Sequence, residues 1–260
     1  MQQTIRIERD GRGVATLWLA RAEKHNALSA EMIAELTEAA GMLGADAAVR
    51  VVVLAAEGRS FCAGGDLGWM RAQFEADPET RRDEAAKLAH MLEALNALPK
   101  PLIGRVQGNA FGGGIGMMAV CDTVVAVEEA VFALTETRLG LIPATIGPYV
   151  VARMGEAKAR RVFMSGRRFD SAEAVALGLV AELCAPSDLE AAVEAQVAPY
   201  LACAPGAVAR AKALLRALGP RIDEAVIAQT IDALAECWAD GEAHEGIAAF
   251  FERRHPGWQE

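Results

Sequence analysis

The stretch LIGRVQGNAFGGGIGMMAV, Leu102–Val120, decides the fold of this chain. Its first part, Leu102–Val106, begins with two apolar residues and ends in valine, which predicts a strand. The glycines of Gly112–Gly114 follow, and the small and apolar residues after them predict a short helix that ends at Val120. A strand that turns through glycines into a helix is typical of an α/β fold, in which helices pack on a sheet.

The same order of strand, glycine loop and helix occurs earlier in the chain. Val51–Leu54 predicts a buried strand, and the loop Gly58–Gly68 leads from it into a long helical pattern that ends before Pro99. Pro78 argues against a helix in the first part of that segment, because proline interrupts a helix interior. The two units together predict a sheet whose strands alternate with helices.

Further elements extend this pattern toward both ends of the chain. Thr4–Arg9 and Val14–Leu19 are apolar or β-branched runs joined by a turn that contains glycine, which predicts a hairpin. Ser29 is a suitable N-cap for a helix that runs through Met42. Thr123–Val127 predicts a third internal strand.

From about residue 157 onward the composition shifts to alanine-rich helix. An apolar helical tail of this length needs a surface to cover, so it either folds over the same subunit or builds an interface between subunits. The expected helices are Ala172–Ala176, Leu189–Cys203, Ala207–Leu218, Asp223–Trp238 and Glu242–Arg253.

The composition predicts a soluble cytoplasmic protein with a globular core. Hydrophobic residues make up 53% of the 260 residues, yet no apolar run is long enough to span a bilayer. The N-terminal residues lack the apolar segment of a secretory signal. A net charge of −9 disfavours a sequence-independent binder of nucleic acid. Neither a disulfide framework nor a zinc site is expected from the widely spaced cysteines, which are Cys62, Cys121, Cys184, Cys203 and Cys237.

Two glycine loops, Ser60–Leu67 and Gly108–Gly114, are candidates for a catalytic site. Each stands where a strand passes into a helix, so backbone N–H groups there lack helical partners. Two such N–H groups that converge on one point form an oxyanion hole. The alternative is that the glycines only permit tight turns, and spacing alone does not choose between these interpretations.

Glu136 is the carboxylate that suits proton transfer. It lies among apolar residues in Phe132–Pro143, and burial favours the neutral form of a carboxylate, which suits a general acid or base. The alternative is a surface glutamate paired with Arg138. The chain has no phosphate-binding loop, no G-x-G-x-x-G, no G-x-S-x-G and no histidine pair at i, i+4. No metal site is therefore expected, and Cys62 has no identifiable histidine partner for a nucleophilic role.

In their order along the chain, these segments resemble the crotonase family of enoyl-CoA hydratases and isomerases. The matching segments are Arg21–Leu28, Phe61–Leu67, Gly108–Gly114 with Ala119–Asp122, Phe132–Gly155, Glu173–Val180 and Glu245–Arg254. Each is weak by itself, but their shared order makes a chance match negligible. The resemblance implies an α/β fold, a crotonase-like spiral of stacked ββα turns with a C-terminal helical trimerisation region. Residues 1–200 would form the spiral core with the CoA site, and residues 201–260 the helical oligomerisation region.

The resemblance also implies an acyl-CoA thioester substrate, no cofactor beyond the coenzyme A of that substrate, and a homotrimer or homohexamer. The N–H groups of Ala63 and Gly113 would hold the thioester carbonyl, and Glu136 would move protons. Lys24 and the Ala63–Asp66 backbone would line the adenine–diphosphate end of CoA, whereas Phe250 and Arg253 would reach the CoA of a neighbouring subunit. The substrate-binding residues that it implies are Lys24, Ala27, Cys62, Gly64, Gly65, Asp66, Leu67, Gly116, Pro143, Phe250 and Arg253.

One position departs from the family pattern. Two-glutamate hydratases of the family have a catalytic glutamate two residues after the third glycine, where this chain has Gly116. The chain therefore resembles one-glutamate members, and we expect a hydro-lyase that acts on a 2-enoyl-CoA with a branched or acidic acyl group. Leu139–Val151 is similar to the corresponding segment of bacterial methylglutaconyl-CoA hydratases of leucine breakdown. The alternatives are a Δ3,Δ2-enoyl-CoA isomerase and a non-catalytic CoA-binding or assembly protein, although the retained Glu136 argues against the latter.

Gly116 also predicts a shape for the cleft. A glycine early in a helix lowers helix stability by about 1 kcal/mol relative to alanine, so a use for it is expected. The expected use is room for the acyl group beside Glu136, in which case Gly116→Glu would crowd a bulky or acidic substrate more than a small one.

Overall fold

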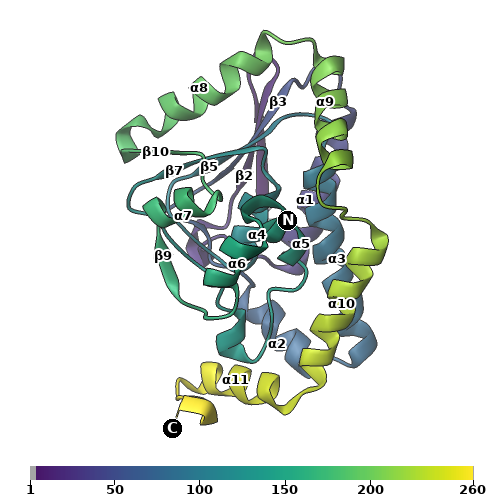
Figure 1. Ribbon diagram of the computed structural model, residues 1–260, viewed down its shortest axis with the longest axis vertical. Coiled ribbons are helices and arrows are strands. Elements are labelled where there is room, and N and C mark those ends of the chain that lie inside the picture. Colours follow the sequence, from purple (N-terminus) through teal and green to yellow (C-terminus); the bar gives the residue numbers. More distant parts are fainter. Residues whose placement is uncertain (1–3, 260) are drawn as a thin grey trace.

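The computed structural model describes residues 4–259, which form two sheets with helices around them (Figure 1). The larger sheet has six strands in the order β1, β2, β3, β5, β7 and β10. β1 pairs antiparallel with β2, and every other neighbouring pair in this sheet is parallel. Its strands are β1 (Ile5–Arg9), β2 (Val14–Leu19), β3 (Val51–Ala56), β5 (Leu102–Val106), β7 (Thr123–Val127) and β10 (Glu182–Cys184).

The smaller sheet consists of four strands of three residues each, in the order β4, β6, β8 and β9. Three times, the chain forms one strand of the larger sheet and then one strand of the smaller sheet before it enters helical structure. These consecutive strands are β3 and β4, β5 and β6, and β7 and β8. This repetition is the predicted spiral of stacked ββα turns. The strands are β4 (Ser60–Cys62), β6 (Asn109–Phe111), β8 (Val131–Ala133) and β9 (Arg168–Asp170).

The predicted helices are present in the predicted order, and Gly147–Met154 and Glu156–Phe163 are two further helices that were not predicted individually. The Ser29 side chain accepts a hydrogen bond from the Met32 N–H at 3.3 Å and caps α1. The long helix expected before Pro99 is two helices, because Pro78 begins α3 and ends the run of α2. The α-helices are α1 (Ala30–Ala45), α2 (Leu67–Glu75), α3 (Pro78–Ala97), α4 (Gly113–Val120), α5 (Gly147–Met154), α6 (Glu156–Phe163), α7 (Ser171–Leu177), α8 (Leu189–Leu201), α9 (Pro205–Leu218), α10 (Glu224–Ala239) and α11 (Gly241–Glu252).

The strands that the sequence does not predict are the short ones. The whole smaller sheet and β10 are built from three-residue strands. A segment of that length is too short for alternation of apolar and polar residues to appear. The tail from residue 157 onward is therefore less uniformly helical than predicted, since β9 and β10 interrupt it.

The parallel strands form the centre of the core, and all six residues of β3 are buried. The C-terminal helices pack against different elements. α8 packs on β5 and β7, α10 packs along α3, and α11 packs against the short 3₁₀ helix Glu136–Leu139. In Figure 1, α9 and α10 run along the side that carries α1 and α3, and α11 closes the lower end. Only α9 among these four helices has no buried residue.

Across residues 4–259, no helix combines the length and the apolar character needed to cross a membrane.

Candidate active site

Both glycine loops open onto one cleft with a volume of about 330 Å³. One wall comes from the loop before α2 and another from the start of α4. The segment around Glu136 forms a third, and α10 and α11 of the same chain complete the enclosure. Residues that line the cleft include Gly65, Gly113, Glu136, Arg138, Ile146 and Arg168.

The first glycine loop is held by backbone hydrogen bonds to the preceding loop. The Leu28 N–H donates to the Gly64 carbonyl at 2.8 Å, and the Asp66 N–H donates to the Leu28 carbonyl at 2.9 Å. Successive N–H groups of an extended chain point in opposite directions, so the Gly65 N–H points away from Leu28. Within residues 4–259, the Gly65 N–H donates no hydrogen bond.

The predicted oxyanion donor Ala63 is wrong. Its N–H donates to the His25 carbonyl at 3.0 Å and is therefore not available to a ligand. The free donor in this loop is Gly65, two residues further along, which the sequence analysis placed only among the substrate-binding residues. The motif located the loop, but the direction of each N–H depends on the pairing with Leu28, which the sequence did not reveal.

Asn26 holds these loops together and was not identified as a functional residue. It is fully buried with a φ of 53°, and its side-chain amide accepts from the Arg21 N–H at 2.9 Å. The amide also donates to the carbonyls of Glu57 at 2.8 Å and Ser60 at 2.9 Å. Its left-handed backbone conformation sets it apart from most residues that are not glycine. This conformation cannot be read from the sequence, which explains why Asn26 was missed.

The second glycine loop presents the Gly113 N–H. Gly112 has a φ of 48° and donates its own N–H to the Ala133 carbonyl at 3.0 Å. Gly113 is the first residue of α4, so its N–H is one of the donors that a helix start leaves unpaired. Gly65 and Gly113 line the same cleft, an arrangement suited to holding an oxyanion.

Glu136 is half-buried, but its Oε2 atom is shielded from solvent and has no hydrogen-bond partner in the described part of the chain. Burial raises the pKa of this carboxyl from its ordinary value of 4.5 to about 7. The carboxyl lies over Gly112, where a Cβ atom would be 3.1 Å from Oε1. The acid therefore lies next to the second glycine loop and exchanges protons readily near neutral pH.

Glu136 does not pair with Arg138, so the surface ion-pair alternative is wrong. Arg138 is exposed and packs over Gly166, where a Cβ atom would be 2.8 Å from its Cγ. Among residues 4–259, neither Arg138 nor Arg168 forms an ion pair with a carboxylate. Both line the cleft of Glu136, which makes that cleft attractive to an anionic group.

The expectation that Gly116 leaves room for the acyl group is wrong. A Cβ atom on Gly116 would be 2.3 Å from Cγ2 of Ile146 and 2.9 Å from its Cβ. The volume beside Gly116 is therefore filled by a side chain of the same protein. Gly116 is buried and does not line the cleft, whereas Ile146 does.

The Cys62 side chain does not reach the cleft, so its predicted contact with substrate is wrong. Its sulfur is fully buried and accepts a hydrogen bond from the Gly64 N–H at 3.4 Å. Burial raises the pKa of the thiol to about 12, which also excludes a nucleophilic role near neutral pH.

The remaining predicted ligand residues divide between the cleft and its surroundings. Those on the cleft wall are Ala63, Gly64, Gly65, Leu67, Gly113, Glu136, Pro143 and Phe250. Those outside the wall are Lys24, Ala27, Asp66 and Arg253. Asp66 caps α2 by accepting from the Gly68 and Trp69 N–H groups, and it pairs with Arg21 at 3.0 Å.

The C-terminal helices complete the cleft of their own subunit. Phe250 lines that cleft, and its reach to the CoA of a neighbouring subunit stays a prediction. α11 lies directly on the segment that carries Glu136: a Cβ atom on Gly140 would be 2.4 Å from the Glu242 carbonyl, and one on Gly246 would be 2.5 Å from the Leu139 carbonyl carbon. This contact joins distant parts of the chain, which explains why the sequence did not reveal it.

Comparison with known proteins agrees with this geometry. Residues 9–260 match the family model described as enoyl-CoA hydratase/isomerase. The crystal structure of an enoyl-CoA hydratase from Shewanella pealeana is 37% identical, covers 99% of this chain and 97% of its own, and has a TM-score of 0.81. That of an enoyl-CoA hydratase from Mycobacterium smegmatis is also 37% identical, covers 99% of each chain, and has a TM-score of 0.80.

A relative with a narrower name is the 2,3-dehydroadipyl-CoA hydratase of Escherichia coli, which is 33% identical over 248 residues and covers 95% of each chain. The matched family, the shared fold and the named relatives identify an enzyme of the hydratase type, a lyase. The chain belongs to the enoyl-CoA hydratase/isomerase, or crotonase, family.

Proposed function

We propose that this protein is an enoyl-CoA hydratase that adds water to a 2-enoyl-CoA thioester with Glu136 as its single catalytic carboxyl. The observation that carries the proposal is the unpartnered Oε2 of Glu136 in a cleft that two free backbone N–H groups, those of Gly65 and Gly113, also face. A buried carboxyl with a pKa of about 7 is suited to taking up and returning a proton.

The chemistry follows from the acidity of the carbon next to a thioester. When water adds, its oxygen bonds to the β-carbon and one of its protons passes to the Glu136 carboxylate. The electron pair of the double bond moves toward the thioester oxygen, where the N–H groups of Gly65 and Gly113 stabilise the enolate by about 3–4 kcal/mol each. The α-carbon then takes the proton from Glu136, which restores the carboxylate.

Lys24 and the backbone of Gly64 to Asp66 would hold the adenine–diphosphate end of CoA, outside and at the edge of the cleft. Lys24 is exposed, and it lies on the loop that pairs with this backbone through Leu28 and Gly65. Its ammonium group is therefore accessible to a phosphate. No other cofactor is proposed.

The acyl group would carry a second acidic group, as in methylglutaconyl-CoA. Arg138 and Arg168 line the cleft without a carboxylate partner in the described chain, and the E. coli relative is named for a substrate with a terminal carboxylate. By contrast, Arg81 donates to the carbonyls of Gln73 at 2.8 Å and Phe74 at 3.0 Å, which leaves it less available for a ligand.

A second candidate is a Δ3,Δ2-enoyl-CoA isomerase, because one carboxyl with a pKa near 7 suffices to move a proton along the acyl chain. The deciding experiment measures activity on crotonyl-CoA, a 3-enoyl-CoA and methylglutaconyl-CoA. Hydration of a 2-enoyl-CoA supports the proposal. Double-bond migration without hydration supports the isomerase, and failure to turn over any of the three supports a non-catalytic CoA-binding protein.

Arg138→Met and Arg168→Met are expected to lower kcat/KM for methylglutaconyl-CoA by about tenfold or more, the effect of losing a charged hydrogen bond. Activity on crotonyl-CoA should change less than about threefold, because its acyl group has no carboxylate. Arg167→Met is the matched control: Arg167 pairs with Glu173 at 2.7 Å and does not line the cleft. If the variants instead lose kcat/KM equally on both substrates, and this loss is absent with thioesters of dephospho-CoA, the arginines bind the phosphate of CoA and not the acyl group.

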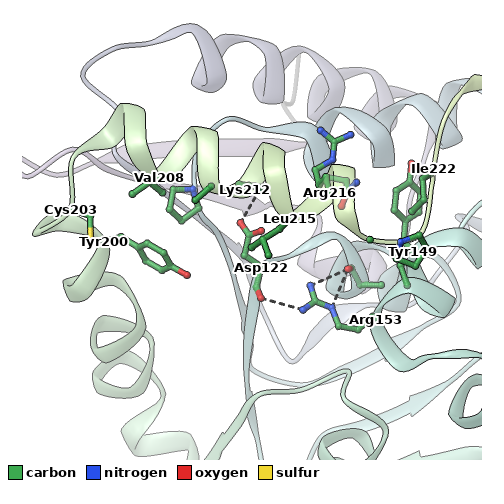
Figure 2. A pocket seen from close by; sticks show the side chains of 17 residues that line it. Asp122, Tyr149, Arg153, Tyr200, Cys203, Val208, Lys212, Leu215, Arg216 and Ile222 are labelled. Atoms are coloured by element: carbon green, nitrogen blue, oxygen red, sulfur yellow. Dashed lines mark hydrogen bonds and ion pairs between the residues drawn. The ribbon is translucent and has the colours of Figure 1, made fainter.

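The protein would form a trimer or a dimer of trimers through its helical region at residues 201–260. The support is α9, whose exposed leucines include Leu215 at 71% and Leu218 at 75% exposure. A cavity of about 610 Å³ lies beneath α9 (Figure 2), where Tyr149 and Ile222 lie at one end and Tyr200 at the other. Lys212 of α9 lines this cavity, and its Nζ forms an ion pair with Oδ2 of Asp122 at 2.7 Å, which Figure 2 shows as a dashed line.

Leu215→Asp combined with Leu218→Asp is expected to convert this assembly into a 27.5 kDa species at micromolar concentration, because buried charges destabilise an interface. Sedimentation velocity measures the change. Met42→Asp serves as the control, since Met42 is also exposed, at 48%, but lies on α1. A wild-type protein that sediments only as a monomer would contradict the proposal.

A further inference from the structure

Two side chains that line the cleft lie over glycines at and near the start of α4. The Gly116 N–H donates to the Gly112 carbonyl at 3.2 Å, so the two glycines are one helical turn apart. The Glu136 carboxyl lies over Gly112, and the Ile146 side chain lies over Gly116. Glu136 and Ile146 also line the same cleft, so the Ile146 side chain borders that cleft one helical turn along α4 from the glycine under the catalytic carboxyl.

Ile146 leaves no space for any side chain at position 116. It is 2% exposed, and a Cβ atom on Gly116 would overlap both its Cγ2 and its Cβ. A β-branched side chain has little freedom at χ1 and cannot swing aside as a lysine or methionine would. Leu92 of α3 is 3.6 Å from the same Cβ position, an ordinary van der Waals contact, so the overlap at position 116 is with Ile146 alone among the three nearest atoms.

We propose that Ile146 is a specificity-determining residue, which excludes a second carboxyl from position 116 and forms the hydrocarbon wall against which the acyl chain lies beside Glu136. The proposal rests on the proposed hydratase function. Gly116 and Ile146 thus depend on each other, because the Ile146 side chain occupies the volume that any side chain at position 116 would need. The wall is apolar at the place where a second acid would hold water, so Glu136 alone exchanges protons with water and with the α-carbon.

The first test measures thermal unfolding and needs no substrate. Gly116→Glu alone is expected to lower Tm strongly, because the new side chain meets Ile146. The double variant Gly116→Glu with Ile146→Gly should lose less Tm than the sum of the losses of the two single variants, which is the non-additivity expected of residues in contact. Losses that simply add in the double variant would overturn the pairing of Gly116 with Ile146. Gly41→Glu is a control on α1, where an added Cβ would meet nothing within 4 Å.

The second test measures specificity. Ile146→Ala is expected to raise the ratio of kcat/KM for 3-methylcrotonyl-CoA over crotonyl-CoA by about tenfold, the size of effect that one methyl group has in an apolar pocket. Ile146→Val should shift the same ratio in the same direction by less. An unchanged ratio in both variants would overturn the role of Ile146 as an acyl wall.

The two tests separate this proposal from the proposed function. If no enoyl-CoA is hydrated, the hydratase proposal fails. The comparison of Tm between the double variant and the two single variants still decides whether Gly116 and Ile146 are in contact. If hydration is observed but neither Tm nor the substrate ratio responds as expected, the inference about Ile146 fails and the hydratase remains.

Discussion

Replacing Glu136 with glutamine is expected to lower turnover by about 10²–10⁴-fold, the usual contribution of a general acid–base group. Glutamine has nearly the shape of glutamate, so the cleft and its binding of CoA should be preserved. The wild-type rate should rise with pH through about 7 as the carboxylate forms, and this rise should be missing from the residual rate of the variant. Turnover within about threefold of wild type on the best substrate would remove Glu136 from the mechanism.

The same variant should be more stable than the wild type. Burial raises the pKa of Glu136 from 4.5 to about 7, so the folded state binds the proton more tightly than the unfolded state does. The wild type therefore loses stability as pH rises from about 4.5 to about 7, by up to about 3 kcal/mol, and the loss is constant above that range. The glutamine of the variant carries no charge, so the variant should exceed the wild-type Tm at pH 8, and the difference should shrink at pH 5.

Gly112→Ala is expected to lower turnover by about 10²-fold, because the Gly113 N–H would no longer point at the thioester oxygen. Gly112 has φ of 48° and ψ of −116°, a conformation that costs a residue with a Cβ atom about 1–3 kcal/mol. The added methyl group would also lie 3.1 Å from Oε1 of Glu136 and displace the acid. Circular dichroism before the assay should establish that the variant is folded.

Gly41→Ala is the matched control for this substitution. Gly41 is exposed within α1 and has nothing within 4 Å of its Cβ position. The change should therefore stabilise the protein, by up to about 1 kcal/mol, and leave turnover unaltered. If Gly112→Ala behaves like Gly41→Ala in both stability and turnover, the Gly113 N–H is not part of an oxyanion hole.

Sequence alone located the loops of the site but not the atoms that face the ligand. Glu136 and Gly113 could be named because each stands at a recognisable place in its motif. Ala63 was chosen where Gly65 has the free N–H, because Gly64 between them has a φ of 92° and turns the backbone, and the bridge between Leu28 and Gly65 then fixes which N–H faces the cleft. An error of two residues in this loop thus replaces a free donor by one bonded to His25.

The environment of Gly116 was beyond sequence reasoning for a different reason. A glycine in place of a glutamate suggests empty space, but Ile146 fills that space from a segment thirty residues away in the chain. Packing between distant segments has no local periodicity from which it can be read. The long strands and helices, in contrast, were predictable because each carries a local signal: β3 is a continuous apolar run, and α1 has apolar residues at helical spacing.

The close contact between α11 and the segment of Glu136 also orders the assembly of the enzyme in time. Gly140 and Gly246 bring two backbones together without side chains between them, so the wall of the cleft takes its final shape only when both are present. A chain still on the ribosome has made both glycine loops and the catalytic glutamate long before Gly246 is added. Such a nascent chain has made the loops of the site before the helix that completes the wall of the cleft, so we expect the cleft to take its shape late in folding.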